Sequence, residues 1–339
     1  MPDQARMQDV AREARVSQST VSRVLNGAPS SIQFSADTRE RVVAAADRLG
    51  YRPNPLARGL RGARTMLLGV IVREITDPFF AGAIEAVSSE AAARGYHVVL
   101  GHAHGRADEA IVLRSVLETR HVDTILVLGD MTDQPRLMED LAGSHVPVVG
   151  LWQGTRSQGL PTISVDNRWG IARAVEHLLA WGHRRIAFVG GRPLGDIEER
   201  QAGWEERIRA AGLALPEGYL QQVPNAPAGG ERALAVLLGL RVPPKAIVCS
   251  TDQLAIGVLH GAAVRGRGVP DELSVTGFDD LPLSSFTVPA LTTVRMPTRE
   301  MARRAVTQAI EGLAPRGEPT VEVLRPELVV RDSTGPATG

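Results

Sequence analysis

The sequence predicts a multidomain protein, in which an all-α helix-turn-helix headpiece precedes an α/β core of two doubly wound subdomains. Three observations lead to this fold class. Apolar residues recur at helical spacing within the first 50 residues, strand-like runs alternate with helical segments from residue 65, and the alternation restarts after residue 166. With 339 residues, 43% of them hydrophobic, the chain can bury more than one core.

The N-terminal segment, residues 6–26, has the pattern of a helix, a tight turn and a second helix. A third helix is expected from a capping Ser35 to a left-handed ending near Gly50. The apolar positions that would share a core are Val10, Ala11 and Ala14 on the first helix, Val16 at the turn, and Val21, Val24 and Leu25 on the second.

The second helix begins with short polar side chains and carries a guanidinium group farther along. These are Ser17, Gln18, Ser19, Thr20 and Arg23. Such side chains suit the reading of base edges in a DNA major groove. Residues 1–64 hold eleven Arg and six acidic residues, whereas the rest of the chain is mildly acidic, and a basic head favours contact with phosphate. The alternative is a helix pair that packs only against its own core.

The core follows a linker at residues 53–64, where Pro53 and Pro55 interrupt helical structure. Ligands of doubly wound sheets bind beyond the carboxyl ends of the strands, so a cleft between two such units is the default site. Strands are expected at 66–72, 98–101, 124–128, 146–151, 163–166, 185–189, 246–249, 273–278, 292–296 and 321–330. Helices are expected at 78–95, 107–120, 134–142, 168–181, 198–211, 229–239 and 252–266.

Several classes of chemistry lack support in the sequence. The one cysteine, Cys249, lies in an apolar run and is expected to be buried, and His102 and His104 have no third metal ligand nearby. No nucleophile elbow or phosphate-binding glycine loop occurs, and Asp279 and Asp280 should point apart. We therefore predict no catalytic residue, cofactor or metal. A signal peptide and a membrane span are also missing, which favours a cytoplasmic protein.

The chain resembles the lactose-repressor (LacI/GalR) family of bacterial transcription regulators over essentially its whole length. The matching segments are Asp9-Val10-Ala11, Val16-Ser17, Thr20-Val21-Ser22-Arg23-Val24-Leu25-Asn26, Thr38-Arg39, Gly50-Tyr51, Pro53-Asn54, Ala57-Arg58, Leu60, Asp77-Pro78-Phe79-Phe80, Gly182-His183, Ile186, Ala202-Gly203-Trp204, Asp252, Ala255, Gly257, Gly277-Phe278-Asp279-Asp280, Pro289 and Leu291-Thr292-Thr293.

This resemblance implies a homodimer that binds a near-palindromic operator in double-stranded DNA. It also implies a core like a type I periplasmic-binding protein, with a small effector between two subdomains. The expected domains are the headpiece at 1–52, a hinge helix or linker at 53–64, an N-subdomain at 65–162 and 291–318, a C-subdomain at 163–290 and 319–332, and a flexible tail at 333–339. The tail has no heptad pattern, which favours a dimer over a tetramer.

The resemblance also assigns DNA contacts. Gln18 and Ser19 would set base preference, Arg23 would contact guanine, and Leu60 would wedge into the minor groove. The alternatives are a merely solvated Gln18 and a Leu60 packed on its own headpiece. The loop after Asn26 is about three residues longer than is usual in the family, by the same resemblance. The full set of candidate DNA-binding residues is Ser17, Gln18, Ser19, Thr20, Ser22, Arg23, Asn26, Tyr51, Asn54, Ala57, Arg58 and Leu60.

For the effector, Arg200 and Asp279 match the family's ligand-binding arginine and acidic residue, a pair that suits a polyhydroxy ligand. The alternatives are a surface ion pair of Arg200 with Glu198 or Glu199, and a capping role for Asp279. The remaining candidates are Thr251, where the family often has Asn, one of Phe79 and Phe80 as a stacking platform, and Asp166 with Trp169.

Residues 224–227 replace an aromatic side chain that the family often places in the cleft. A sugar or sugar derivative is expected as the effector, with a nucleobase or nucleoside next. Whether the effector releases DNA or promotes its binding stays open. Two other classes share such a core: a transport solute-binding protein, which would need a signal peptide or lipid anchor, and an α/β enzyme, which would need a catalytic constellation.

Overall fold

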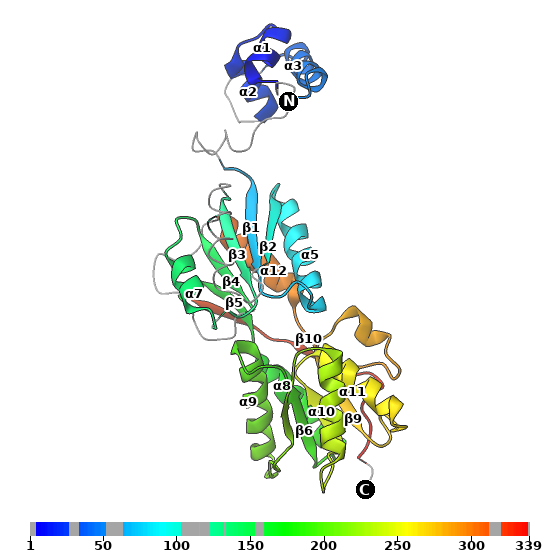
Figure 1. Cartoon of the computed structure of the whole chain (residues 1–339). Coiled ribbons are helices and arrows are strands. Elements are labelled where there is room, and N and C mark those ends of the chain that lie inside the picture. The colour runs from blue at the N-terminus through cyan, green and yellow to red at the C-terminus, as the bar shows by residue number, and fades with distance from the viewer. Residues whose placement is uncertain are drawn as a thin grey trace. The chain divides into compact units, whose positions relative to one another are not determined.

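The computed structural model describes residues 5–26, 34–51, 64–102, 115, 122–131, 133–152, 159–311 and 320–337. The chain forms two compact units, Met1–Thr65 and Met66–Gly339 (Figure 1). Several predictions lie outside the described residues. They are the hinge with Asn54, Ala57, Arg58 and Leu60, the loop after Asn26 and the Asn26 side chain, His104, and the helix expected at 107–120.

The headpiece contains three helices, α1 (Met7–Glu13), α2 (Gln18–Asn26) and α3 (Ala36–Arg48). Each begins where the sequence offers a cap: the Arg6 amide donates to the Asp9 carboxylate, and the hydroxyls of Ser17 and Ser35 accept from the amides of Thr20 and Thr38. Gly50 has φ of +61°, as a left-handed helix ending requires. The buried core consists of Val10, Ala11, Ala14, Val21, Val24, Val42, Ala45 and Ala46, with Val16 and Leu25 packed against it.

The N-subdomain of the core is built on a parallel six-stranded sheet with the order β11-β5-β4-β3-β1-β2. Its strands are β1 (Leu67–Val72), β2 (His97–His102), β3 (Thr124–Leu128), β4 (Val148–Leu151), β5 (Thr162–Val165) and β11 (Val321–Leu324). Its helices include α5 (Pro78–Ala92), α7 (Pro135–Ala142) and α12 (Thr298–Glu311). All five residues of β3 are buried, as expected for a central parallel strand.

The C-subdomain is built on a second six-stranded sheet with the order β12-β10-β9-β8-β6-β7, in which β12 alone is antiparallel to its neighbour. Its strands are β6 (Ile186–Gly190), β7 (Leu220–Gln222), β8 (Ala246–Cys249), β9 (Ser274–Asp279), β10 (Thr292–Arg295) and β12 (Glu327–Val329). Its helices include α8 (Asn167–Ala180), α9 (Gly195–Ala210), α10 (Pro227–Leu238), α11 (Asp252–Val264) and the 3₁₀ helix η1 (Pro282–Ser285).

The chain crosses between the subdomains at places that differ from the predicted boundaries. All of β5 pairs within the N-subdomain, β10 pairs with β9 in the C-subdomain, and the strand expected at 321–330 divides into β11 and β12 on different sheets. Asp166, Pro297 and Pro326 mark the three crossings. Asp166 caps α8 directly after β5, and Pro297 and Pro326, which cannot donate to a strand ladder, lie two residues after the ends of β10 and β11.

Other differences are local. The short edge strand β7 was not expected, because its polar sequence carries no strand signal, and α9 and α10 begin three and two residues before the predicted starts. Cys249 is buried as predicted, and this burial raises the pKa of its thiol. Within the described ranges, no helix is long and apolar enough to span a membrane.

Candidate functional site

The start of α2 presents polar side chains to solvent. Ser17, Gln18 and Ser19 are exposed, and Ser17 Oγ lies 2.7 Å from Ser19 Oγ and 2.9 Å from Thr20 Oγ1. Arg23 is exposed one turn farther along, and neither it nor Gln18 has a hydrogen-bond partner among the residues that the structure describes. The hydroxyls thus organise the helix start, whereas Gln18 and Arg23 keep their donors available.

Two further DNA candidates sit closer to the headpiece core. Ser22 is half-buried on α2, and Tyr51 is half-buried where it packs against the headpiece core. The amide of Tyr51 donates to the carbonyl of Ala46, at 2.8 Å, so the backbone here completes the ending of α3. Tyr51 therefore has a structural role that the sequence did not reveal.

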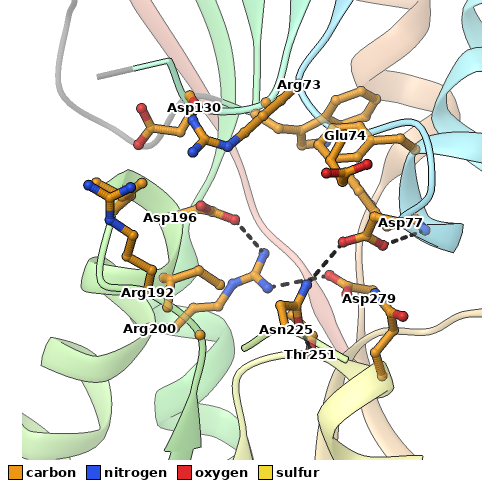
Figure 2. Close-up of a pocket in the computed structure, with 18 of the residues that line it drawn as sticks. Arg73, Glu74, Asp77, Asp130, Arg192, Asp196, Arg200, Asn225, Thr251 and Asp279 are labelled. Carbon is orange, nitrogen blue, oxygen red and sulfur yellow. Dashed lines mark hydrogen bonds and ion pairs between the residues drawn. The ribbon is translucent and has the colours of Figure 1, made fainter. Parts of the chain in front are cut away.

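A cavity of about 560 Å³ lies between the two core subdomains (Figure 2). The N-subdomain lines it from β5, from the ends of β1, β3 and β4 and from the start of α5. The C-subdomain lines it from the start of α8, from α9 and from the residues that end or follow β6, β7, β8 and β9. Five of the predicted effector residues line it, and these are Phe79, Phe80, Arg200, Thr251 and Asp279.

Arg200 lies at the floor of this cavity and is only 2% exposed. Its Nε donates to Asn167 Oδ1 at 2.9 Å, and its Nη1 donates to the carbonyl of Ser250 at 2.7 Å and lies 3.4 Å from Asp279 Oδ1. Its Nη2 lies 3.4 Å from Asp196 Oδ2, and its guanidinium stacks on the Phe278 ring at 3.7 Å. The alternative of a surface ion pair with Glu198 or Glu199 is therefore wrong.

Asp279 ends β9 and turns into the cavity with φ of +115°. Burial raises the pKa of Asp279 well above its ordinary value, although Arg200 opposes the shift. Asp280 points elsewhere, to Arg295 at 2.7 Å and Arg331 at 2.6 Å. The two carboxylates diverge as predicted, so they form no acid–base pair.

A hydrogen-bonded chain joins the subdomains across the cavity. Thr251 Oγ1 donates to Asn225 Oδ1 at 2.6 Å, and Asn225 Nδ2 donates to Asp77 Oδ2 at 3.0 Å (Figure 2). A second bridge runs through Asp133, which accepts from Arg73 of its own subdomain at 2.7 Å and from Arg192 of the other at 3.3 Å.

Sequence reasoning did not propose Asp77, Asn225 or Asp196 as site residues. Asp77 had a signal, because it stands before the Pro78 that opens a helix, at a strand-to-helix turn beside the cleft. Asn225 lies in the segment 224–227 that the resemblance places at the cleft, whereas Asp196 had no signal, because only the folded chain brings it to the cavity.

Aromatic side chains form one wall of the cavity. Phe79 meets both Phe80 and Trp152 edge-to-face, with ring centroids 5.4 Å and 5.2 Å apart. Phe80 is 8% exposed and belongs mainly to the core, whereas Phe79 is half-buried. Both border the cavity, and Phe79 is the better placed to contact a ligand.

Asp166 does not line this cavity, which corrects its assignment as an effector residue. Its carboxylate caps α8 by accepting from the Trp169 amide at 2.9 Å, and it borders a separate surface hollow between α8 and α9. Trp169 lies at the same hollow, with the guanidinium groups of Arg173 and Arg325 near its ring. The capping requirement of a helix that follows a strand explains both placements.

No group of potential metal ligands occurs in the described part of the chain. His102 lies 3.7 Å from Glu74 Oε1 and is an ordinary partner of that carboxylate.

Residues 6–54 match the model for bacterial regulatory proteins of the lacI family, and residues 175–334 match that for a periplasmic binding protein-like domain. Catabolite control protein A of Priestia megaterium is 34% identical over 302 residues, covering 88% of this chain and 89% of that protein. The transcriptional repressor CytR of Escherichia coli K12 is 33% identical over 335 residues, covering 97% and 96%.

The chain belongs to the lacI family of bacterial regulatory proteins. As a LacI-family member it is a DNA-binding transcription regulator, and its relatives are regulators rather than enzymes. A lac repressor dimer bound to operator and the anti-inducer ONPF matches with a TM-score of 0.87 at 27% identity, covering 98% of this chain and all of that one. The regulator CelR in complex with cellobiose matches with a TM-score of 0.70 at 30% identity, covering 97% and 99%.

Proposed function

We propose that this LacI-family regulator is a dimeric cytoplasmic repressor whose affinity for a near-palindromic operator changes when a sugar or sugar derivative occupies the cleft. The observation that carries the proposal is the cavity around Arg200, because side chains from both subdomains line it. A ligand there touches two bodies that can move relative to each other, and so it can distinguish two conformations.

The ligand's chemistry follows from the lining. Arg200 donates hydrogen bonds and Asp279 accepts them, and a hydroxyl group can form a hydrogen bond with either. Phe79 and Trp152 offer apolar edges to a sugar ring. The volume of about 560 Å³ lies in the range of small-molecule sites. The cellobiose complex of CelR, a relative of the same length, supports a sugar-sized occupant.

Control of DNA affinity requires that the ligand bind one conformation better than the other. The contacts of Asp77 with Asn225 and of Asp133 with Arg192 link the two subdomains, so a ligand that strengthens or breaks them shifts the balance between conformations. A near-complete switch needs about a ten-thousand-fold preference, or about 5.5 kcal/mol.

On the DNA side, Arg23 is proposed to pair with guanine, and Gln18 with Ser19 to set base preference. Thr20, Ser22 and Asn26 are proposed to contact phosphate or to cap structure, and Leu60 to be the minor-groove wedge with Ala57 and Arg58 beside it. Ser17, Tyr51 and Asn54 complete the proposed DNA-binding set.

Dimerisation has its own support on the C-subdomain. Leu283, Phe286 and Val288 are 61%, 81% and 93% exposed, on and just after η1. An exposed apolar patch of this kind marks an association surface. The lac repressor relative is a dimer on its operator.

Fluorescence anisotropy of the purified chain on its own upstream DNA tests the proposal, against scrambled competitor DNA at physiological salt and with or without a sugar panel. We expect tight binding that survives the competitor and shifts with a sugar, and the sign of the shift separates an inducer from a corepressor. Specific binding that no small molecule changes would reject control through the cleft.

A further inference from the structure

Acidic side chains outnumber basic ones around the cavity. Five carboxylates and three guanidinium groups line it, and these are Glu74, Asp77, Asp130, Asp196 and Asp279, with Arg73, Arg192 and Arg200. Figure 2 shows them arranged around a common space. Arg73 and Arg192 both form ion pairs with a sixth carboxylate, Asp133, at 2.7 Å and 3.3 Å. Of the three lining guanidinium groups, Arg200 alone forms no ion pair with Asp133 in the described part of the chain.

Arg200 is itself largely committed. A guanidinium group has five N–H donors, and those of Arg200 reach Asn167, the Ser250 carbonyl, Asp279 and Asp196. Among its charged side chains, the cavity therefore offers a ligand more acceptors than donors, which suits a ligand rich in donors.

A second polar feature lies in the cavity wall. Ser164 is on β5 at the cavity and is fully buried, and its Oγ has no hydrogen-bond partner among the described residues. A buried hydroxyl without a partner is costly, and a polar ligand group reaches it only if the wall shifts, because Ser164 has no exposed surface.

Burial makes the ionised form of several of these carboxylates costly. Burial raises the pKa of Asp77, and it raises the pKa of Asp196 to about 6. Burial is also the main cause of the raised pKa of Asp279, to which the charges of Asp77 and Asp196 add. A neutral sugar brings hydroxyl donors but no charge, whereas a cation offsets the cost of holding several anionic groups out of water.

We propose that the effector is an amino sugar, a polyhydroxy ring that carries a protonated amine, and that the amine lies among Asp77, Asp196 and Asp279. The inference rests on the proposed function, in which the cleft binds a sugar derivative. It adds the charge of that ligand.

Calorimetric titration of the full chain with size-matched pairs tests the charge. The pairs are cellobiose with the β-1,4-linked dimer of glucosamine, and glucose with glucosamine, and putrescine serves as an amine without a ring. We expect the amino member of at least one pair to bind at least tenfold more tightly than its neutral partner and than putrescine. Three results would overturn the proposal. They are equal or tighter binding of the neutral sugar, binding of putrescine as tight as that of the amino sugar, and no detectable binding of either amino sugar at 10 mM.

A variant that removes one carboxylate tests where in the cavity the amine lies. Asp196→Asn keeps the size of the side chain and removes its charge, and it should reduce the preference for the amine about tenfold. Glu198→Gln is the matched control, because Glu198 is exposed on the same helix and does not line the cavity. An unchanged preference in Asp196→Asn would remove Asp196 from the amine site.

DNA binding separates this inference from the proposed function. If a neutral sugar weakens or strengthens operator binding, the proposed function stands and the proposal of an amino sugar is rejected. Tight amine binding without any effect on operator affinity upholds the amine and rejects control through the cleft.

Discussion

The exposed face of α2 and the floor of the cleft place one kind of side chain in opposite settings. Arg23 is exposed and finds no partner among the described residues, whereas Arg200 is 2% exposed and contacts Asn167, Ser250, Asp196 and Asp279. The guanidinium group of Arg23 is solvated and available to an external partner. That of Arg200 is held in place by the fold before any ligand arrives.

This difference predicts how the two regions tolerate change. A substitution on α2 should alter recognition and leave folding intact, because an exposed side chain loses little on truncation. A substitution at the cleft floor should alter both, because it leaves buried carboxylates without their counter-charge.

The largest effect is expected from a residue in neither region. Phe286→Asp should make the chain monomeric and weaken operator binding at least about 100-fold, because a monomer brings one headpiece where a dimer brings two. Sedimentation and anisotropy measure the two effects. Val242→Asp is the control, since Val242 is also exposed but far along the chain from η1. A Phe286→Asp variant that remains dimeric would place the dimer interface elsewhere.

Arg200→Ala comes next and tests the cleft. We expect the loss of any sugar response, preserved operator binding, and a free energy of unfolding lower by about 3 kcal/mol, because two carboxylates lose their buried partner. Urea unfolding and anisotropy provide the measurements. Arg200→Lys retains the positive charge but not the planar set of N–H donors, so it should restore the free energy of unfolding more than the sugar response. A normal sugar response in Arg200→Ala would move the site away from this cavity.

Arg23→Lys tests the exposed helix with the charge conserved. Discrimination between operator variants should fall about tenfold, because an ammonium group cannot pair with guanine through two donors. Binding to random DNA and thermal stability should not change. If the variant discriminates as well as the parent, Arg23 contacts phosphate only.

The smallest effect is a pH dependence at Asp196. Burial, its largest cause, raises the pKa of Asp196 from 3.8 to about 6, and Asp130 adds to the shift. The native state therefore binds this proton more tightly than the unfolded state, so the associated stability is present below pH 3.8 and is lost as the pH rises through about 6.

Asp196→Asn removes that titration. The variant should match the parent near pH 4 and exceed its free energy of unfolding by about 1 kcal/mol at pH 7, because the 28% exposed side chain is partly screened by solvent. Chemical denaturation across this range measures the difference. A constant difference at every pH would mean that Asp196 stays ionised throughout.

Local patterns were sufficient for the headpiece and for most elements of the core. Ser17 and Ser35 cap helices in the structure because capping depends on neighbours three residues away. The strands 124–128 and 246–249 have the predicted bounds, because a run of buried apolar residues is visible in the sequence itself. Arg200 and Asp279, which line the cavity, were singled out through the family motifs that carry them, and their role in effector binding stays a prediction.

The crossing points and the neighbours of Arg200 needed the tertiary structure. Nothing local distinguishes a strand that joins one sheet from a strand that joins the other, so β10 and β11 were assigned to the wrong subdomains. Asn225 meets Asp77 across 148 positions of sequence, and Asp166 caps its own helix instead of facing the cleft. Most helices and strands could be predicted from the sequence, because their periodicity is a local property, although β7 and α12 could not. Only the folded chain decided which charges share the cavity, because those distances depend on contacts between residues far apart in sequence.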